Sequence, residues 1–178
     1  MARIPSCLST RRRSVRLTRV DTEPETRTTT LGAELTDRLP VDTWSEDPAV
    51  LILPERLHNA DGITYAAFRQ EAQSLRTALR DAGFTVHLAV PPGARKATYE
   101  EHDASWVLPI LMSLGPLPME VLGSVIGNWI TAQIEKLGPK ARITYREGHC
   151  SADGAIDVLE ITGAADGVVR AIEARFEQ

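Results

Sequence analysis

The apolar positions of the chain fall into short runs whose spacing predicts alternating strands and helices. Residues 49–53 (AVLIL) form a continuous apolar run between two prolines, which is typical of a strand buried on both faces. Residues 64–83 carry apolar side chains at steps of three and four, so they predict a helix that begins at Thr64 and ends at Gly83. Residues 84–90 alternate in polarity and predict a second strand, parallel to the first because a helical crossover joins the two.

The middle of the chain predicts a third strand followed by a longer helix. Residues 106–113 have the composition of a strand, in which Pro109 requires either an edge position or a bulge. Residues 118–137 place their apolar side chains on one face of a helix, and Gly138 with the proline after it would end this helix.

The last part of the chain predicts a hairpin and a closing helix. Residues 142–147 and 155–161 are expected to pair as two strands, with Asp153 and Gly154 in the turn between them. The apolar positions of residues 168–176 then recur with the period of a helix.

This order of elements predicts an α+β fold, or a small α/β fold, in which a mixed sheet of about five strands packs against three helices. Residues 1–47 are polar and show no sustained period, so we expect a disordered tail that is basic at first and then acidic. A misassigned start is a second explanation for this tail. Residues 48–178 are expected to form a single α+β domain, since their number suits one core.

Residues 106–137 have a second interpretation, as a membrane span. Glu120 lies in the middle of this run, and prolines and a glycine interrupt it. No window of about 18 residues is therefore free of both a charge and a helix breaker. We expect a strand-turn-helix unit in water and no membrane partner.

The distribution of charge limits the partners of the protein. The net charge is −4, but the first 19 residues contain six arginines and no acidic residue. Without these six positive charges, the rest of the chain carries −10. Because phosphate binding requires clustered lysine and arginine, we expect no nucleic-acid partner except at the tail.

The cysteines and the amino end indicate the compartment. Cys7 and Cys150 are the two cysteines, and Cys7 falls in the tail, so neither a disulfide framework nor a multi-cysteine metal site is expected. The amino end lacks the apolar stretch of a secretory signal. Only three of the twenty basic residues are lysines, which is typical of a GC-rich bacterial genome. We therefore expect a cytoplasmic bacterial protein.

Charged side chains follow the two strands that are predicted to be parallel. Glu55, Arg56 and His58 come after the first strand, and Arg95 and Lys96 come after the second. Because ligands collect beyond the carboxyl ends of parallel strands, these residues predict a ligand-binding crevice. Arg95 and Lys96 would hold an anion there, and Glu55 or His58 would move a proton. The alternative is that all five are solvated loop residues, which is the default at a surface.

Two further clusters could carry chemistry. Residues 100–103 (EEHD) are rich in metal ligands, but neighbours in sequence point in different directions and no second cluster completes a site. His149, Cys150 and Asp153 suggest a nucleophile with its base, but residues of one hairpin seldom have that geometry, and turn residues are the better interpretation. We therefore predict no catalytic residue, no cofactor and no metal ion.

From about Phe84 to its end, the chain resembles the small α+β domains called effector-associated constant components of actinobacterial conflict systems. The segments that carry the resemblance are LGSVIGNWI, RITYREG followed by DGAIDVLEITGA, and DGVVRAIEARF. The segment EEHDASWVLPIL and the unit at residues 49–83 depart from the pattern, so the resemblance covers roughly half of the chain. It implies a protein partner and brings no catalytic residues to carry over.

Three functional hypotheses follow, and we favour the first. The chain is a non-enzymatic cytoplasmic interaction or accessory domain, which couples to a bacterial conflict or defence effector. Alternatively, it is a small-molecule or nucleotide-binding protein or an enzyme that uses the predicted crevice. The third hypothesis is association with a membrane through residues 106–137. The sequence leaves open the identity of the partner and the oligomeric state, including a homo-oligomer.

Overall fold

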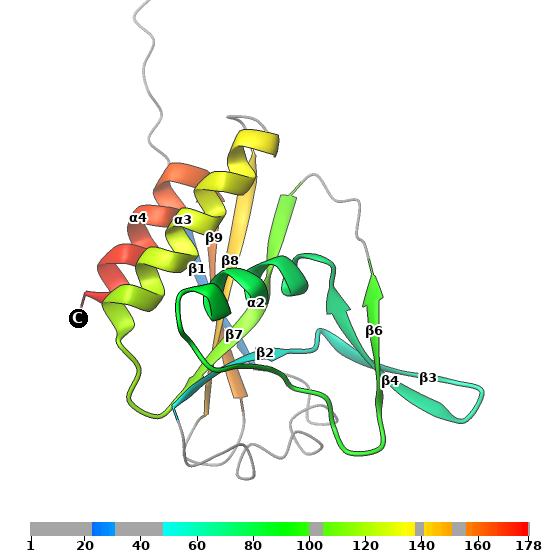
Figure 1. The fold of residues 1–178 in the computed structure, drawn as a ribbon. Coiled ribbons are helices and arrows are strands. Elements are labelled where there is room, and N and C mark those ends of the chain that lie inside the picture. The colour runs from blue at the N-terminus through cyan, green and yellow to red at the C-terminus, as the bar shows by residue number, and fades with distance from the viewer. Residues whose placement is uncertain (1–22, 31–47, 100–104, 138–140, 151–155, 178) are drawn as a thin grey trace, which may run out of the picture.

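The structure is a computed structural model, and it describes residues 23–30, 48–99, 105–137, 141–150 and 156–177. Its largest layer is a mixed six-stranded sheet, sheet A, in the order β1-β9-β8-β7-β2-β5. These strands are β1 (Glu25–Thr30), β2 (Ala49–Leu53), β5 (Val86–Leu88), β7 (Ser105–Leu114), β8 (Arg142–Cys150) and β9 (Ile156–Ala164). The helices that the structure describes are α2 (Glu71–Asp81), α3 (Met119–Leu137) and α4 (Ala165–Phe176). They share one apolar core with sheet A (Figure 1), which confirms the α+β prediction.

The alternation of side chains along β2 divides the apolar interior into two clusters. Val50 and Ile52 join the core that the helices cover. Leu51 and Leu53 join a second cluster with side chains of β7 and β9. All five side chains of β2 are at most 1% exposed. The prediction of a strand buried on both faces is therefore confirmed.

Two of the pairings within sheet A were predicted from the sequence. β2 and β5 are parallel, and β8 and β9 form an antiparallel pair whose turn lies outside the described residues. β7 lies between β2 and β8, so the edge position considered for Pro109 is wrong. Instead, the register of β7 against β8 shifts between Val107 and Ile110. Such an irregularity tolerates Pro109, which has no N–H group to donate to a neighbouring strand.

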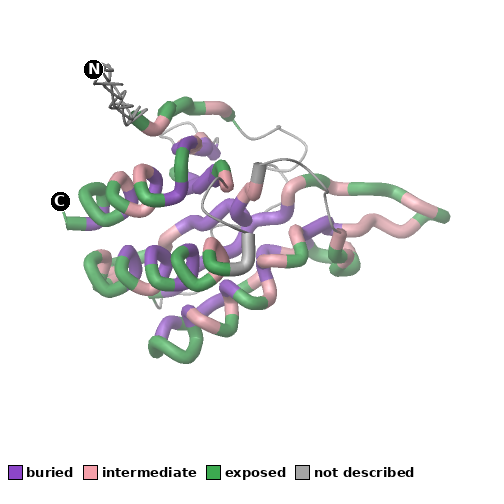
Figure 2. The backbone as a smooth tube through the Cα atoms, turned by 90° about the horizontal axis from the view of Figure 1, so that it is seen from above, coloured by how far each residue is buried: buried purple, intermediate pink, exposed green. Residues whose placement is uncertain are grey.

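A second sheet, sheet B, lies at the end of the molecule away from α3 and α4 (Figure 1). It contains β3 (Arg56–Ala60), β4 (Ile63–Arg69) and β6 (Arg95–Tyr99) in the order β3-β4-β6. The turn of the β3-β4 hairpin is Asp61-Gly62, with φ values of 51° and 76°, as a type I′ turn requires. In Figure 2 this hairpin is mostly exposed or intermediate.

Sheet B overturns two sequence predictions. The helix that we expected from Thr64 begins at Glu71 instead, and residues 63–69 form β4. The apolar residues at 65 and 68 are three positions apart, which fits one turn of a helix. Residues 63–69 form a strand because they pair with β3 and β6, and a local sequence period does not reveal such pairing. Residues 95–99 were expected in a loop and form β6.

The predicted tail also contains a strand. Residues 25–30 form β1, which pairs antiparallel with β9 at the edge of sheet A. Almost all of its side chains are exposed, so it carries no apolar signal. The remaining tail residues, 1–22 and 31–47, lie outside the described part of the chain.

Residues 106–137 form most of β7, a turn and α3, as the strand-turn-helix interpretation predicted. Leu122, Ile126 and Ile130 of α3 are buried in the core. Gly123 and Gly127 lie against Phe176 and Val169 of α4, respectively. Among the described residues, no helix is long and apolar enough to cross a membrane.

Candidate functional site

A hollow of about 500 Å³ opens on sheet B. It is lined by Arg56, Leu57, His58, Tyr65, Ala67, Ala97 and Tyr99. The lining comes from all three strands of the sheet, so the hollow exists only because β3, β4 and β6 are paired.

The register of sheet B explains why a hollow forms here. Ala67 of β4 pairs with Arg56 on one side and with Ala97 on the other. Side chains that pair across neighbouring strands share a face, as do residues two apart along a strand. The two alanines therefore form a low floor, and Tyr65 and Tyr99 rise from the same face on opposite sides of it.

The walls of the hollow combine aromatic rings with positive charge. The guanidinium of Arg56 lies over the Tyr99 ring, 5.1 Å from its centroid, and that of Arg69 lies 5.8 Å from the same centroid. Both distances are within the range of cation–π attraction. Arg56 and His58 are exposed, so they are accessible to a bound molecule.

A buried ion-pair network lies beside the hollow. Arg146 of β8 donates hydrogen bonds to both carboxylate oxygens of Glu55, one of them at 2.6 Å. The Arg69 guanidinium lies 3.6 Å from the same carboxylate. The side chains of Glu55 and Arg146 are only 10% and 9% exposed. A carboxylate held by two guanidinium groups is a structural anchor, and the proton-transfer role considered for Glu55 has no support in this geometry.

The backbone of β7 supplies the remaining partner of Arg146. The Leu108 carbonyl accepts hydrogen bonds from Nε at 2.8 Å and from Nη2 at 2.6 Å. Leu108 has no partner in the ladders of β7 with β2 or with β8, because it lies at the irregularity beside Pro109. The guanidinium therefore donates to a backbone carbonyl that would otherwise be buried without a hydrogen-bond partner.

The structure places the five predicted site residues in four different settings. Arg56 and His58 line the hollow. Arg95 pairs with Tyr65 and lies on the same face of the sheet, beyond the lining. Lys96 points to the opposite face, because successive residues of a strand alternate. Glu55 lies in the ion-pair network. The five residues therefore do not all gather in one crevice at the ends of β2 and β5.

Sequence reasoning missed the residues that shape this hollow. Ala67 and Ala97 form its floor and Tyr65 and Tyr99 flank it. Residues 95–99 give only a weak period-of-two signal for β6, because the charged Arg95 shares a face with Ala97 and Tyr99.

A second polar cluster lies on β8 and α4. Glu147 is almost completely buried and accepts a hydrogen bond from Arg175 Nε at 2.6 Å. His149 Nε2 lies 3.3 Å from the Glu147 carboxylate and 2.9 Å from Arg175 Nη2. The suggested cluster of His149, Cys150 and Asp153 stays a hypothesis, because the Cys150 side chain and Asp153 lie outside the described residues.

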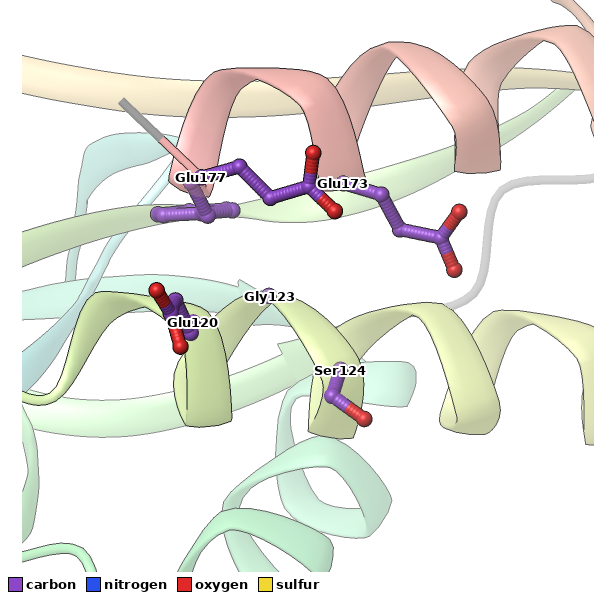
Figure 3. A pocket seen from close by; sticks show the side chains of 6 residues that line it. Glu120, Gly123, Ser124, Glu173 and Glu177 are labelled. Atoms are coloured by element: carbon purple, nitrogen blue, oxygen red, sulfur yellow. The ribbon is translucent and has the colours of Figure 1, made fainter.

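A cleft of about 440 Å³ lies between α3 and α4, and Figure 3 shows its lining. Glu120 and Ser124 come from α3, Glu173 comes from α4, and Glu177 directly follows α4. All three carboxylates are exposed. Exposed carboxylates along two helices are an ordinary solvated surface, so we assign no site to this cleft.

In the described part of the chain, no group of three or more His, Cys, Asp or Glu residues could hold a metal ion. Residues 100–103, the metal-ligand cluster noted in the sequence, are not among those described. Comparisons with protein-family models, with curated proteins and with solved structures found no match to this chain.

Proposed function

We propose that this chain is a non-enzymatic interaction domain that binds a protein partner at the hollow of sheet B. The observation that carries the proposal is the lining of the hollow, where Tyr65, Tyr99 and Arg56 surround a floor of alanines. Tyrosine and arginine dominate the binding energy of protein interfaces, because they offer a large rigid area together with polar groups.

The state of the neighbouring charged groups also favours binding over catalysis. Glu55 directly precedes β3, and it is held by Arg146 and Arg69. General acid–base catalysis needs a group that can exchange its proton with a substrate. Within the described residues, His58 is the remaining titratable group of the lining besides the tyrosines and Arg56. One histidine without an orienting partner is a weak basis for an enzyme.

The proposed setting is the bacterial cytoplasm, and the proposed partner is an effector of a conflict or defence system. This part rests on the resemblance of the segment from Phe84 onward to effector-associated constant components. Sheet B falls partly outside that segment, since β3 and β4 precede it. The hollow would then be a binding feature added to the shared part of the fold.

The test is to capture partners from the native host with the whole chain, and to measure the affinity of a purified partner for matched variants. Tyr65→Ala removes an aromatic wall of the hollow, and we expect it to weaken binding by about 2 kcal/mol or roughly 30-fold. Val121→Ser is the control, because Val121 is 48% exposed on α3, far from sheet B. The proposal is wrong if no stoichiometric partner is found, or if Val121→Ser weakens binding while Tyr65→Ala does not.

A second candidate is a small molecule bound in the same hollow. Its volume of about 500 Å³ falls in the range of roughly 300–1,000 Å³ for ligand pockets. A metabolite that raises the melting temperature of the wild type but not of Tyr65→Ala would favour this candidate.

A further inference from the structure

We infer that the hollow of sheet B binds an acidic segment of its partner, with an apolar side chain on the alanine floor and carboxylates against Arg56 and Arg95. This inference rests on the proposed function and adds the chemistry of the partner. It follows from the charge of this face, from the charge of the rest of the chain and from the shape of the hollow.

The face of sheet B that carries the hollow is cationic. Its charged or titratable positions are Arg56 and His58 on β3, Arg69 on β4 and Arg95 on β6. No acidic residue occupies this face within β3, β4 and β6. Arg69 is compensated by Glu55. No ion pair joins Arg56 or Arg95 to a carboxylate of the described residues, and both are exposed.

This charge is an exception in an acidic protein. Outside the six arginines of its first 19 residues, the chain carries a net charge of −10. Such a surface repels an acidic partner everywhere except where basic side chains gather. Complementary charge at this face therefore favours docking of an acidic partner here over docking on the acidic remainder of the folded part.

The lining of the hollow suits an apolar side chain of a polypeptide. Ala67 and Ala97 leave an apolar floor between two tyrosine rings, which matches an aromatic or branched aliphatic group. Arg56 and Arg95 lie two strand spacings apart across the sheet and two residues apart along it, or about 12 Å between their backbone positions. Carboxylates two or four residues apart in an extended peptide, at about 3.4 Å per residue, leave the same face of it and can therefore approach both long arginine side chains.

A single-stranded nucleic acid also combines anionic groups with planar ones, and aromatic sheet surfaces bind such strands. Its phosphates form a continuous line of charge, which would extend from the small cationic face over the acidic remainder of the chain. A short acidic peptide segment carries its charge only where this face can accept it. The observations therefore favour a peptide.

The test is selection of 12-residue peptides from a random display library on the folded whole chain. We expect enrichment of sequences with two or more Asp or Glu residues around one aromatic or aliphatic residue. A selected peptide, labelled with a fluorophore, should bind Arg95→Glu at least about tenfold more weakly than the wild type. Lys96→Glu is the matched control, since it makes the same charge change one residue away on the opposite face, and it should change the affinity less than about twofold.

Several outcomes would overturn the inference. Selected peptides that are neutral or basic would do so, as would equal losses of affinity in Arg95→Glu and Lys96→Glu. Binding of poly-dT or poly-U oligonucleotides that competes with the peptide, and that is stronger than it, would assign the face to nucleic acid. If a partner from the host still depends on Tyr65 while acidic peptides are not selected, the inference fails and the proposed function stands. If no partner depends on Tyr65 but acidic peptides bind as expected, the charge complementarity stands without the proposed protein interaction.

Discussion

Alanine substitutions at the two glycines of α3, Gly123 and Gly127, should change the stability of the protein in opposite directions. A Cβ at position 123 would lie 2.8 Å from Phe176 Cβ and Cδ2, whereas a Cβ at position 127 would lie 3.5 Å from Val169 Cγ1 and 3.7 Å from Glu173 Oε1. The first distance is shorter than real Cβ contacts, and the second is ordinary van der Waals contact.

The magnitudes follow from two opposing terms. Alanine is favoured over glycine in a helix interior by about 1 kcal/mol. Overpacking a buried contact costs about 1–3 kcal/mol. The Cβ of Phe176 cannot move without α4, so Gly123→Ala should have a net effect between about zero and a loss of 2 kcal/mol. Gly127→Ala should gain up to about 1 kcal/mol, because it meets no clash.

Chemical denaturation in urea measures this difference. Trp106 and Trp129 pack with ring centroids 5.1 Å apart in the core, so their fluorescence should report the loss of tertiary structure. Far-UV circular dichroism and an unchanged m-value would show that both variants unfold as the wild type does. A Gly123→Ala protein that is at least as stable as Gly127→Ala would refute the close packing of α3 on α4. In Gly123→Ala, hydrogen exchange should locate the loss of stability in the last turn of α4, beside Phe176.

Three further variants test other parts of the fold. Glu55→Ala should lower the free energy of unfolding by about 3–5 kcal/mol, because it leaves the buried charge of Arg146 without its counter-ion; urea denaturation measures this, and a loss below about 1 kcal/mol would contradict the network. Burial raises the pKa of Tyr145 well above its ordinary value, and the charge of Glu147 adds to this effect. The folded state therefore keeps a proton that the unfolded state releases above about pH 10, so stability should fall with rising pH by up to about 1.4 kcal/mol per unit. Tyr145→Phe should remove this dependence on pH. The prediction is refuted if denaturation curves from roughly pH 9 to 11 show the same fall in the free energy of unfolding for the wild type and for Tyr145→Phe. Gly62→Ala should cost about 1 kcal/mol in thermal unfolding, since φ is 76° at this turn position, and an unchanged melting temperature would argue against the type I′ turn.

The elements that the sequence predicted correctly are those whose apolar pattern reflects their own burial. β2 is a continuous apolar run because both of its faces are covered. α3 shows a helical period because only part of its surface meets the core. β1 and β6 could not be found by the same criterion, since their side chains are mostly exposed or half-buried. They are strands because a neighbouring strand offers them hydrogen bonds.

The candidate site was only partly predictable for a related reason. Arg56 and His58 were identified from their position after β2, and the period of two in β3 then places both on the hollow. The turn signal Asp61-Gly62 was present in the sequence and would have predicted the β3-β4 hairpin. The pairing of Arg146 with Glu55 joins residues 91 positions apart, and no local pattern reveals such a contact.

The position of Glu55 suggests why a buried ion pair occurs beside the hollow. This residue lies between the end of β2 and the start of β3, where the chain passes from sheet A to sheet B. It binds Arg146 of sheet A and lies close to Arg69 at the end of β4, whose guanidinium lies over Tyr99. Apolar side chains could fill this junction with similar stability, but they would not fix one geometry, because apolar contacts have little directionality. A bidentate pair has a defined geometry, so it orients sheet B against sheet A and holds Tyr99 at the wall of the hollow.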